Sequence, residues 1–400
     1  MPLLLHLTPL LLRVWKTLHS LLNGGVLVAW WSGLGMLAWG RKRYLLLSEV
    51  QPDPPATERL PALSIVVPAC NEAETVEKAM GSLLALDYPA VEIIAVDDRS
   101  TDTTGAILDR LAARNPRLRV IHIACLPEGW LGKNHAMQVA SEEATGEWLL
   151  FTDADVVYAP DALRRAVAYA DRRGLDHLVL APYCETHGFW ERLFLSYFTL
   201  MYTFRVRIWD ISNPKSSAYA GFGAFNLVRA AAYRKCGGHA ALPMETVDDM
   251  KLGKVLKRNG FRAELLRGTD LLSVRWMVGL RGVVNGLTKN AFAAYDFRLD
   301  RMLGSIVGIA ITGIYPVVGL LLPCAPARWL AAGTLLAMIL GAGATRRANG
   351  AGAAYGLAYP LAALVLIYII LRSTWWTYRR NGIIWRGTRY PLDALRRGIV

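Results

Sequence analysis

Three long stretches of the chain contain no charged residue. They are residues 20–40, 302–327 and 348–371. Each is as long as the roughly 20 residues that a helix needs to cross a bilayer. With 54% hydrophobic residues, the chain is also too apolar for a single soluble domain. We therefore predict an integral membrane protein.

The charges after the first apolar stretch predict the side of the membrane on which the next part of the chain lies. Arg41, Lys42 and Arg43 follow it directly, which is a stop-transfer pattern and not the cleavage site of a signal peptide. By the positive-inside rule, the domain that follows is cytoplasmic. A net charge of +13 fits a protein that lies against anionic lipid headgroups. Nucleic-acid binding is a poorer explanation, because the arginines flank the apolar stretches and form no single patch interleaved with aromatic residues.

The C-terminal region leaves the number of spans there open between two and three. Residues 372–400 contain seven arginines and one aspartate, so they should be cytoplasmic. A cytoplasmic domain and a cytoplasmic tail require an even number of spans between them, yet residues 329–345 form a third apolar candidate. Because this run is short and rich in Gly and Ala, we expect that it does not cross. The alternative is a tail that violates the rule.

Short apolar runs alternate with helical patterns in the middle of the chain. The runs at 63–68, 91–96 and 119–123 predict buried strands, and Pro68 ends the first of them. Residues 74–86 have the apolar spacing of a helix. This alternation predicts an α/β fold, with a parallel sheet and helices on both faces. Ligands of such sheets bind at the carboxyl ends of the strands.

Two carboxylates one residue apart follow a further apolar run, within residues 147–157. Asp153 and Asp155 would project to the same side of an extended chain, and a cation would relieve their repulsion. Mg²⁺ and Mn²⁺ favour carboxylate oxygens and complete their shells with phosphate and water. Acidic residues also follow or end the first two strands, at 72 and at 97–98, so we expect a site at this edge. The alternative is a strand-end turn with two solvated acids.

A tight loop precedes Lys133, which opens a predicted helix. The loop contains Pro127, Gly129 and Gly132. A lysine at a helix N-terminus beside acidic strand ends is suited to bind a diphosphate. The alternative is a solvated loop lysine.

Four motifs together resemble those of the family 2 inverting glycosyltransferases, in that family's order and at its spacings. They are Ile-Val-Val-Pro-Ala-Cys-Asn-Glu at 65–72, Val-Asp-Asp-Arg-Ser-Thr-Asp at 96–102, Gly-Trp-Leu-Gly-Lys-Asn at 129–134 and Thr-Asp-Ala-Asp at 152–155. The resemblance covers residues 63–290 and extends to the membrane-bound branch that acts on lipids, which includes hopanoid-associated, carotenoid and ceramide-type enzymes. It implies a GT-A fold, a nucleotide-sugar donor, with UDP as the expected nucleotide, and a divalent metal, Mn²⁺ or Mg²⁺.

The resemblance implies roles for residues at the ends of the first two strands. Asp98 resembles the carboxylate that reads the uracil ring, and a carboxylate can accept an N–H from a base edge. Pro68, Asn71 and Glu72 would lie near the nucleoside. Lys133 would assist the leaving diphosphate.

The resemblance also implies metal and catalytic residues. Asp155 resembles the metal ligand, and Asp153 resembles its partner near the ribose and the sugar. Asp249 matches the family's catalytic base, with Asp248 as its acidic neighbour. An inverting transfer needs a carboxylate to take the proton of the acceptor hydroxyl, and Asp248 would raise the proton affinity of Asp249. The alternative for this pair is a helix N-terminus, where acidic residues are favourable.

Residues 272–276 resemble the Gln-x-x-Arg-Trp signature of the membrane-bound members. Arg275 would pair with the leaving diphosphate, and Trp276 would face the acceptor or the donor. Leu272 stands where the signature has Gln, which weakens an inference to processive polymer synthesis. Residues 183–210 are aromatic and apolar, and we expect a helix in the headgroup region; the alternative is a buried core helix.

The predicted organisation is an N-terminal membrane anchor at 1–50, a linker at 51–62, a GT-A domain with interfacial helices at 63–300, transmembrane helices at 301–371 and a basic cytoplasmic tail at 372–400. The predicted enzyme is a hexosyltransferase that moves a sugar from a nucleotide donor to a hydroxyl or carboxylate of a lipid. Its expected partners are the donor, the acceptor and membrane lipids, and no nucleic acid. Two alternatives remain, a processive polysaccharide synthase and a catalytically silent transferase fold that serves as a membrane scaffold.

Overall fold

The chain forms two compact units in the computed structural model, which describes residues 2–54 and 60–399. The predicted linker at 51–62 therefore lies partly outside the described residues. The helical unit comprises Met1–Gly40, Thr186–Arg205 and Met277–Thr374, and the sheet unit comprises Arg41–Glu185, Val206–Trp276 and Trp375–Val400.

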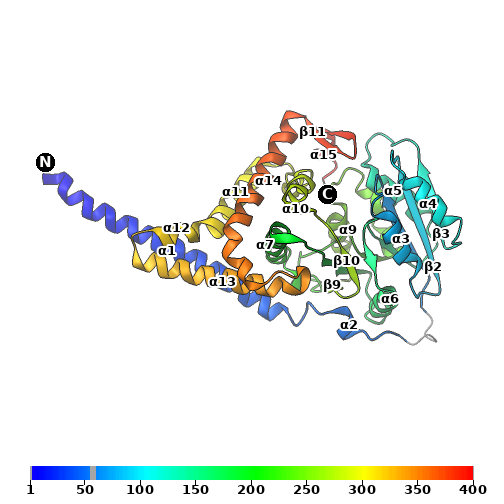
Figure 1. Ribbon diagram of the computed structural model, residues 1–400, viewed down its shortest axis with the longest axis horizontal. Helices are drawn as coiled ribbons and strands as arrows, with labels where there is room; N and C mark the ends of the chain where they lie inside the picture. The colour runs from blue at the N-terminus through cyan, green and yellow to red at the C-terminus, as the bar shows by residue number, and fades with distance from the viewer. Residues whose placement is uncertain (1, 55–59, 400) are drawn as a thin grey trace. The chain divides into compact units, whose positions relative to one another are not determined.

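The sheet unit is built on seven strands in the order β3-β2-β1-β4-β8-β6-β9. Figure 1 labels β2, β3 and β9 of this sheet. The seven strands are β1 (Leu63–Ala69), β2 (Val91–Asp98), β3 (Leu118–Ile123), β4 (Trp148–Phe151), β6 (His177–Ala181), β8 (Asn226–Arg229) and β9 (Ala263–Arg267). Strands β3, β2, β1 and β4 run parallel to one another, and β6 runs parallel to β9. Strand β8 is antiparallel to its two neighbours, β4 and β6. The predicted α/β fold with a mostly parallel sheet is confirmed, and the three predicted strands lie within β1, β2 and β3.

Helices cover both faces of this sheet because its central strands are apolar on both sides. Ile65 and Val67 of β1 pack in one apolar cluster with residues of α3 and α6. Val66 packs on the opposite face, with residues of α5 and α9. Successive residues of a strand face opposite sides, so an uninterrupted apolar run is buried twice. The helices are α3 (Val76–Leu84), α4 (Thr104–Ala112), α5 (Gly132–Glu143), α6 (Ala162–Arg172), α8 (Ala230–Lys235) and α9 (Asp248–Arg258).

The carboxyl ends of β1, β2 and β4 meet at one edge of the sheet. Strand β1 lies between the other two, with Ala69 opposite Asp97 of β2 and Val66 opposite Phe151 of β4. The polar residues that follow these strands are therefore brought together by the register. A smaller sheet of order β5-β10-β7 completes the unit. Its strands are β5 (Val157–Tyr158), β7 (Tyr183–Cys184) and β10 (Leu272–Val274).

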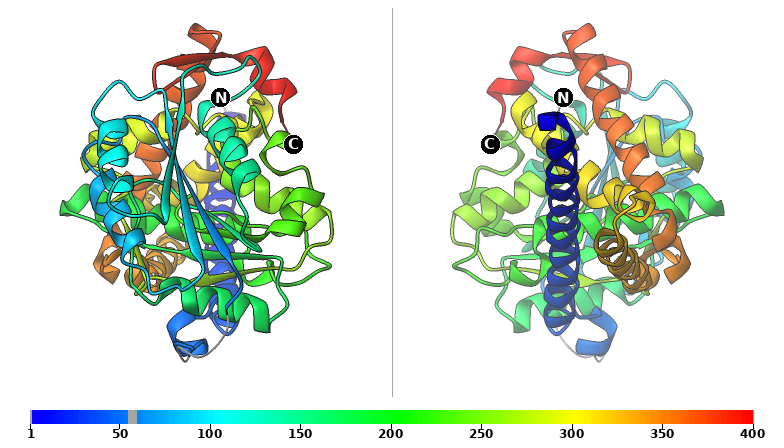
Figure 2. Two further views of the ribbon diagram at one scale, coloured as in Figure 1. Left: turned by 90° about the vertical axis from the view of Figure 1, so that its right-hand side faces the viewer. Right: turned by 90° about the vertical axis from the view of Figure 1, so that its left-hand side faces the viewer.

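The C-terminal segment is an ordered part of the sheet unit, which corrects the prediction of a tail at 372–400. It forms a hairpin of β11 (Gly382–Trp385) and β12 (Thr388–Pro391), followed by α15 (Leu392–Arg397). Figure 2 shows it in red. Ile383, Tyr390, Leu392 and Leu395 are buried between the arginines of this segment. Burying these apolar side chains holds the segment in place although its net charge is strongly positive.

Within the described residues, four helices are long and apolar enough to cross a membrane, and they lie almost wholly in the helical unit. These candidates are Leu11–Gly40 within α1 (Pro2–Gly40), Leu299–Leu321, Ala325–Asn349 and Ala353–Arg379. The second comprises α11 (Leu299–Ile309), a π-helical turn at Ala310–Ile314 and α12 (Tyr315–Leu321), and the last two contain α13 (Ala325–Asn349) and α14 (Tyr359–Arg379). The unit also contains α7 (Gly188–Val206) and α10 (Gly279–Thr288).

The structure adds to two expectations about these helices. The run at 329–345 was expected not to cross because it is short, but it belongs to α13, which has 25 residues. Its caps explain the extra length, because Pro326 stands in the first turn and Gly350 ends the helix with a φ of 72°. Helix α7 fits the alternative of a buried core helix, since Leu193 and Leu200 are buried in a cluster with residues of α1, α13 and α14.

Candidate active site

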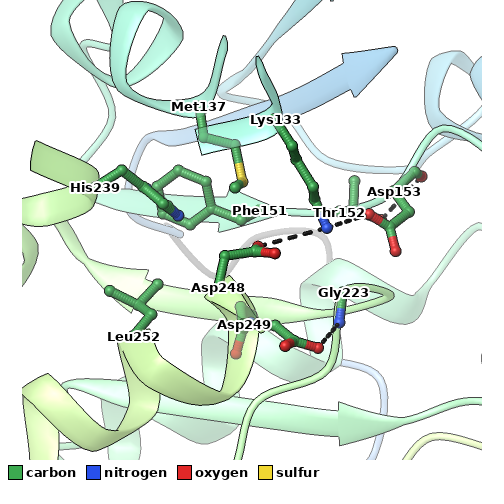
Figure 3. Close-up of a pocket in the computed structure, with 11 residues that line it drawn as sticks. Lys133, Met137, Phe151, Thr152, Asp153, Gly223, His239, Asp248, Asp249 and Leu252 are labelled. Carbon is green, nitrogen blue, oxygen red and sulfur yellow. Dashed lines mark hydrogen bonds and ion pairs between the residues drawn. The ribbon is translucent and has the colours of Figure 1, made fainter. Parts of the chain in front are cut away.

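Four of the predicted site residues line one pocket of the sheet unit, at the carboxyl edge of the sheet (Figure 3). Lys133 lies in the first turn of α5, Asp153 follows β4, and Asp248 and Asp249 begin α9. The pocket is lined by Lys133, Met137, Phe151, Thr152, Asp153, Gly223, Asn226, His239, Asp248, Asp249 and Leu252. A cation and three carboxylates that are far apart in the sequence therefore share one small space.

The ammonium of Lys133 bridges two of these carboxylates. Its Nζ lies 2.8 Å from Oδ1 of Asp153 and 3.4 Å from Oδ2 of Asp248. Burial alone would lower the pKa of Lys133, but the charges of Asp153 and Asp248 outweigh this and raise it. The lysine is therefore a permanent cation in the pocket, and the alternative of a solvated loop lysine does not describe it.

Asp249 is a half-buried carboxylate with a proton affinity suited to exchange near neutral pH. Burial and the neighbouring charge of Asp248 raise its pKa to about 7, against the opposing effect of Lys133. Its Oδ2 accepts a hydrogen bond of 2.9 Å from the backbone N–H of Gly223, and its Oδ1 accepts one of 2.7 Å from Met250. These two bonds orient the carboxylate. Asp248 and Asp249 stand at a helix N-terminus, as the simpler explanation proposed, and they also face the pocket.

Asp155 has one carboxylate oxygen that is buried and has no hydrogen-bond partner in the described part of the chain. Burial and the charges of Asp153 and Glu72 raise the pKa of Asp155 to about 7. A buried oxygen without a partner is costly unless a proton or a cation satisfies it. Within residues 2–54 and 60–399, no three His, Cys, Asp or Glu side chains are grouped so as to hold a metal ion. The donor set therefore fits a cation that takes one or two carboxylates from the protein and its other ligands from phosphate and water.

The residues expected near the nucleoside lie at the ends of β1 and β2. Asn71 adopts a left-handed conformation with a φ of 55°, and its Oδ1 accepts a hydrogen bond of 2.8 Å from the backbone N–H of Thr101. Asp98 is buried and accepts two hydrogen bonds from Arg99, at 2.7 and 3.0 Å. Glu72 forms an ion pair with Arg386. Asp98 and Glu72, the two carboxylates of this group, are therefore each paired with an arginine in the structure.

Two glycines allow backbone to approach the carboxylates closely. A Cβ atom on Gly223 would lie 2.3 Å from Oδ2 of Asp153. A Cβ atom on Gly132 would lie 2.1 Å from Oδ2 of Asp98. Both distances are far shorter than a van der Waals contact, so glycine is needed at each position for the carboxylates to lie where they do.

The other predicted site residues lie outside this pocket. Pro68 lies within β1, opposite Val96 of β2. Arg275 and Trp276 directly follow β10, and both side chains are exposed, 38% in the case of Trp276. They are not among the residues that line the pocket.

His239 belongs to the pocket and was not singled out from the sequence. It is buried, its Nδ1 lies 2.7 Å from the hydroxyl of Tyr233, and its ring packs edge-on against Phe151. Burial, together with the nearby charge of Lys133, lowers the pKa of His239 to about 3. It is therefore neutral beside the lysine. The sequence contains no local signal for this role, because the partners of His239 lie on other elements.

Comparisons with known proteins agree with this geometry. Residues 64–233 match the model of Glycosyl transferase family 2. The chain is 24% identical over 343 residues to 4,4'-diaponeurosporenoate glycosyltransferase of Staphylococcus aureus strain MRSA252, which covers 83% of this chain and 89% of the relative. The enzyme of the same name from strain USA300 is 23% identical over 341 residues, with the same coverage.

A solved structure shares the fold. It is the mannosyltransferase PcManGT from Pyrobaculum calidifontis, in complex with GDP-Man and Mn²⁺. It superposes with a TM-score of 0.52 at 20% sequence identity and covers 88% of this chain and 99% of its own. Together with the family match and the mostly parallel sheet, this shows a GT-A fold. Residues 64–233 of the chain therefore carry a Glycosyl transferase family 2 domain.

Proposed function

We propose that this glycosyltransferase moves a sugar from a nucleotide sugar to a lipid acceptor, with inversion at the anomeric carbon and with Asp249 as the base. The observation that carries the proposal is the position of Asp249, a half-buried carboxylate with a pKa of about 7 that lines the same pocket as Lys133. An inverting transfer to a hydroxyl requires such a group, because the hydroxyl must lose its proton as it attacks the anomeric carbon.

The proposed reaction is a single displacement. The acceptor oxygen forms a bond to the anomeric carbon while its proton passes to the carboxylate of Asp249. The bond from the anomeric carbon to the diphosphate breaks, and the diphosphate leaves with the electron pair. Lys133 would stabilise the negative charge that develops on the leaving group, since a partly buried ammonium acts more strongly than one in water. Asp248, which Lys133 also contacts, would keep the ammonium in position.

A divalent cation fits the carboxylates next to this pocket. Asp155, with its unpartnered buried oxygen, and Asp153 would hold it. Such a cation supplies charge neutralisation for the diphosphate when it is bound. The solved structure with this fold was obtained with GDP-Man and Mn²⁺, which supports a nucleotide sugar and a divalent metal for this chain. We propose a UDP-sugar as the donor on the resemblance of Asp98 to the uracil-reading carboxylate.

The lipid acceptor is proposed from two observations. The part of the chain that the structure describes contains four helices that are long and apolar enough to cross a membrane. The curated relatives are named for a carotenoid acid, 4,4'-diaponeurosporenoate. An acceptor dissolved in the bilayer would reach a membrane-anchored enzyme without entering water. A hydroxyl acceptor would need Asp249 as a base, whereas an ionised carboxylate acceptor would not.

The test is an assay of membranes that contain the protein, with radiolabelled UDP-glucose and Mn²⁺ or Mg²⁺. We expect metal-dependent label in the organic-solvent phase, and its loss in Asp249→Asn. Asp270→Asn, which changes an exposed carboxylate of the same unit, is the matched control and should keep full activity.

The outcomes of this assay separate the alternatives. Label in a solvent-insoluble polymer would favour the processive synthase. If Asp270→Asn also loses the label, the loss in Asp249→Asn is no longer evidence that Asp249 is the base. Absence of label with UDP-glucose leads to the same assay with other nucleotide sugars, GDP-mannose among them, and silence with all of them would favour the scaffold.

A further inference from the structure

The C-terminal hairpin presents an arginine at its tip in an unusual backbone conformation. Strands β11 and β12 pair as far as Trp385 and Thr388, so Arg386 and Gly387 form a two-residue turn. Both have positive φ values, 48° and 80°. Turns of this kind strongly favour Asn-Gly, because a left-handed backbone is unfavourable for a residue with a long side chain. The turn itself therefore does not account for an arginine at position 386.

The guanidinium of Arg386 instead contacts the end of β1. It forms an ion pair with the carboxylate of Glu72 and donates a hydrogen bond of 3.2 Å to the backbone carbonyl of Asn71. The charge of Glu72 helps to raise the pKa of Asp155, and the charge of Asp153 helps to raise the pKa of Glu72. Glu72 is therefore close to both aspartates. The tip of the hairpin thus lies beside the carboxylates that we assign to the donor and its cation.

Two further residues of β12 contact the same edge of the sheet unit. The hydroxyl of Thr388 accepts a hydrogen bond of 3.2 Å from Arg99, which holds both carboxylate oxygens of Asp98. The hydroxyl of Tyr390 accepts one of 3.2 Å from the backbone N–H of Gly132, at the start of α5. Thr388 and Tyr390 share one face of the strand because they are two residues apart. The hairpin therefore contacts the site from three points at once.

The following proposal rests on the proposed function. We propose that the hairpin Gly382–Pro391 forms a wall of the donor site and that Arg386 binds the donor. The guanidinium of Arg386 would donate hydrogen bonds to the phosphate oxygens of the nucleotide sugar. Arginine suits this task, since its planar fork binds phosphate through two parallel hydrogen bonds. Its side chain is 42% exposed, so it has room to turn from Glu72 to an incoming anion. Without a donor, Glu72 holds the arginine near the site.

The hairpin also provides a matched control. Arg389 lies between Thr388 and Tyr390 and points to the other face of β12, where it donates a hydrogen bond of 2.9 Å to the backbone carbonyl of Arg380. It is exposed. Arg389→Ala removes the same charge from the same hairpin without touching the residues at the ends of β1 and β2.

The experiment measures the affinity of the purified full-length protein in detergent for UDP and for GDP, each with Mn²⁺, by titration calorimetry. We expect Arg386→Ala to weaken nucleotide binding by about tenfold to a hundredfold, the range for loss of a hydrogen-bonded charge pair. Arg386→Lys should fall between this variant and the wild type, because it keeps the charge but loses the fork. Arg389→Ala should bind like the wild type.

The outcomes distinguish this proposal from the proposed function. If the wild type binds neither nucleotide, the nucleotide-sugar assignment fails, and the role of Arg386 fails with it. If the wild type binds and Arg386→Ala binds equally well, only the role of Arg386 is overturned. Tighter binding by Arg386→Ala would also overturn it and would show that the hairpin competes with the donor. If Arg386→Ala unfolds at a lower temperature than Arg389→Ala, its weaker binding could come from lost stability. The affinity of Arg386→Lys then tests the proposal, and an affinity of that variant equal to that of the wild type refutes it.

Discussion

The ammonium of Lys133 lies 2.8 Å from Oδ1 of Asp153, so a cation from the first turn of α5 and a carboxylate from the end of β4 form one ion pair in the pocket. The two residues lie 20 positions apart in the sequence and belong to two different motifs. Lys133 also lowers the pKa of Asp249, so the position of the lysine affects the pH at which that carboxyl ionises.

Replacing Lys133 by Met should therefore change both the rate and its pH dependence. Without the lysine, the pKa of Asp249 rises above its value of about 7, so a higher pH is needed to ionise the base. We expect kcat/KM at pH 7 to fall by roughly tenfold or more, since one pH unit of misprotonation alone accounts for a factor of ten. The pH–rate profile measures the shift, and the exposed Lys78→Met is the control. A lower rate with an unmoved profile would contradict the electrostatic role.

The wild-type pH–rate profile should report the pKa of Asp249. A base acts only when it is unprotonated, so with a hydroxyl acceptor kcat/KM should rise by about tenfold per pH unit below pH 7 and level off above it. Asp248→Asn should move this limb to lower pH, because the charge of Asp248 raises the pKa of Asp249. The shift is opposite in sign to that of Lys133→Met. A profile that is flat between pH 5 and 8 would point to an acceptor that needs no base.

The strands and the acidic positions could be predicted from the sequence because both are local signals. A continuous apolar run such as that in β1 is readable without knowledge of its partners. Asp153 follows a strand and Lys133 lies at the start of a helix, and the chain itself marks both boundaries. Once the sheet is parallel, its register brings the residues after β1, β2 and β4 to one edge.

The C-terminal hairpin could not be predicted, because its stability depends on a surface formed by distant residues. Seven arginines in 29 positions, from 372 to 400, are typical of a solvated tail, and Ile383 and Tyr390 are too few to signal a strand pair. The ion pair of Arg386 with Glu72 and the place of His239 in the pocket are tertiary in the same sense. Each depends on groups brought together only by the finished fold.

Gly223→Ala should reduce activity by displacing a carboxylate. A Cβ atom at this position would lie 2.3 Å from Oδ2 of Asp153, so Asp153 would have to move away from Lys133. We expect kcat to fall by about a hundredfold, the loss that a misplacement of about 1 Å can produce. Gly81→Ala is the control, because a Cβ atom there meets nothing within 4 Å and the residue lies within α3. Wild-type kinetics of Gly223→Ala with an unchanged melting temperature would show that the position of Asp153 is unimportant.

The protein should lose stability in mild acid because of a buried histidine away from the pocket acids. His177 of β6 is buried, its Nε2 lies 3.0 Å from Oδ1 of Asn226, and its Nδ1 has no partner among the described residues. A proton on Nδ1 would be a buried donor without an acceptor, and burial lowers the pKa of His177 to about 4. The unfolded chain, with a pKa near 6.5, then binds more protons below that pH, so stability falls by up to about 1.4 kcal/mol per pH unit as the pH drops from 6.5 towards 4.

Thermal unfolding of the purified protein at pH 7.5 and pH 5 measures this loss. His177→Gln, which cannot titrate, should show a smaller difference between the two melting temperatures than the wild type. His122→Gln is a control of opposite sign, because hydrogen bonds to Asp109 and Asp97 raise the pKa of His122. The stability that His122 contributes is present below its unfolded pKa and is lost as the pH rises through its folded pKa. Its removal should therefore enlarge the acid loss, and an equal response of the two variants would refute the assignment of the effect to His177.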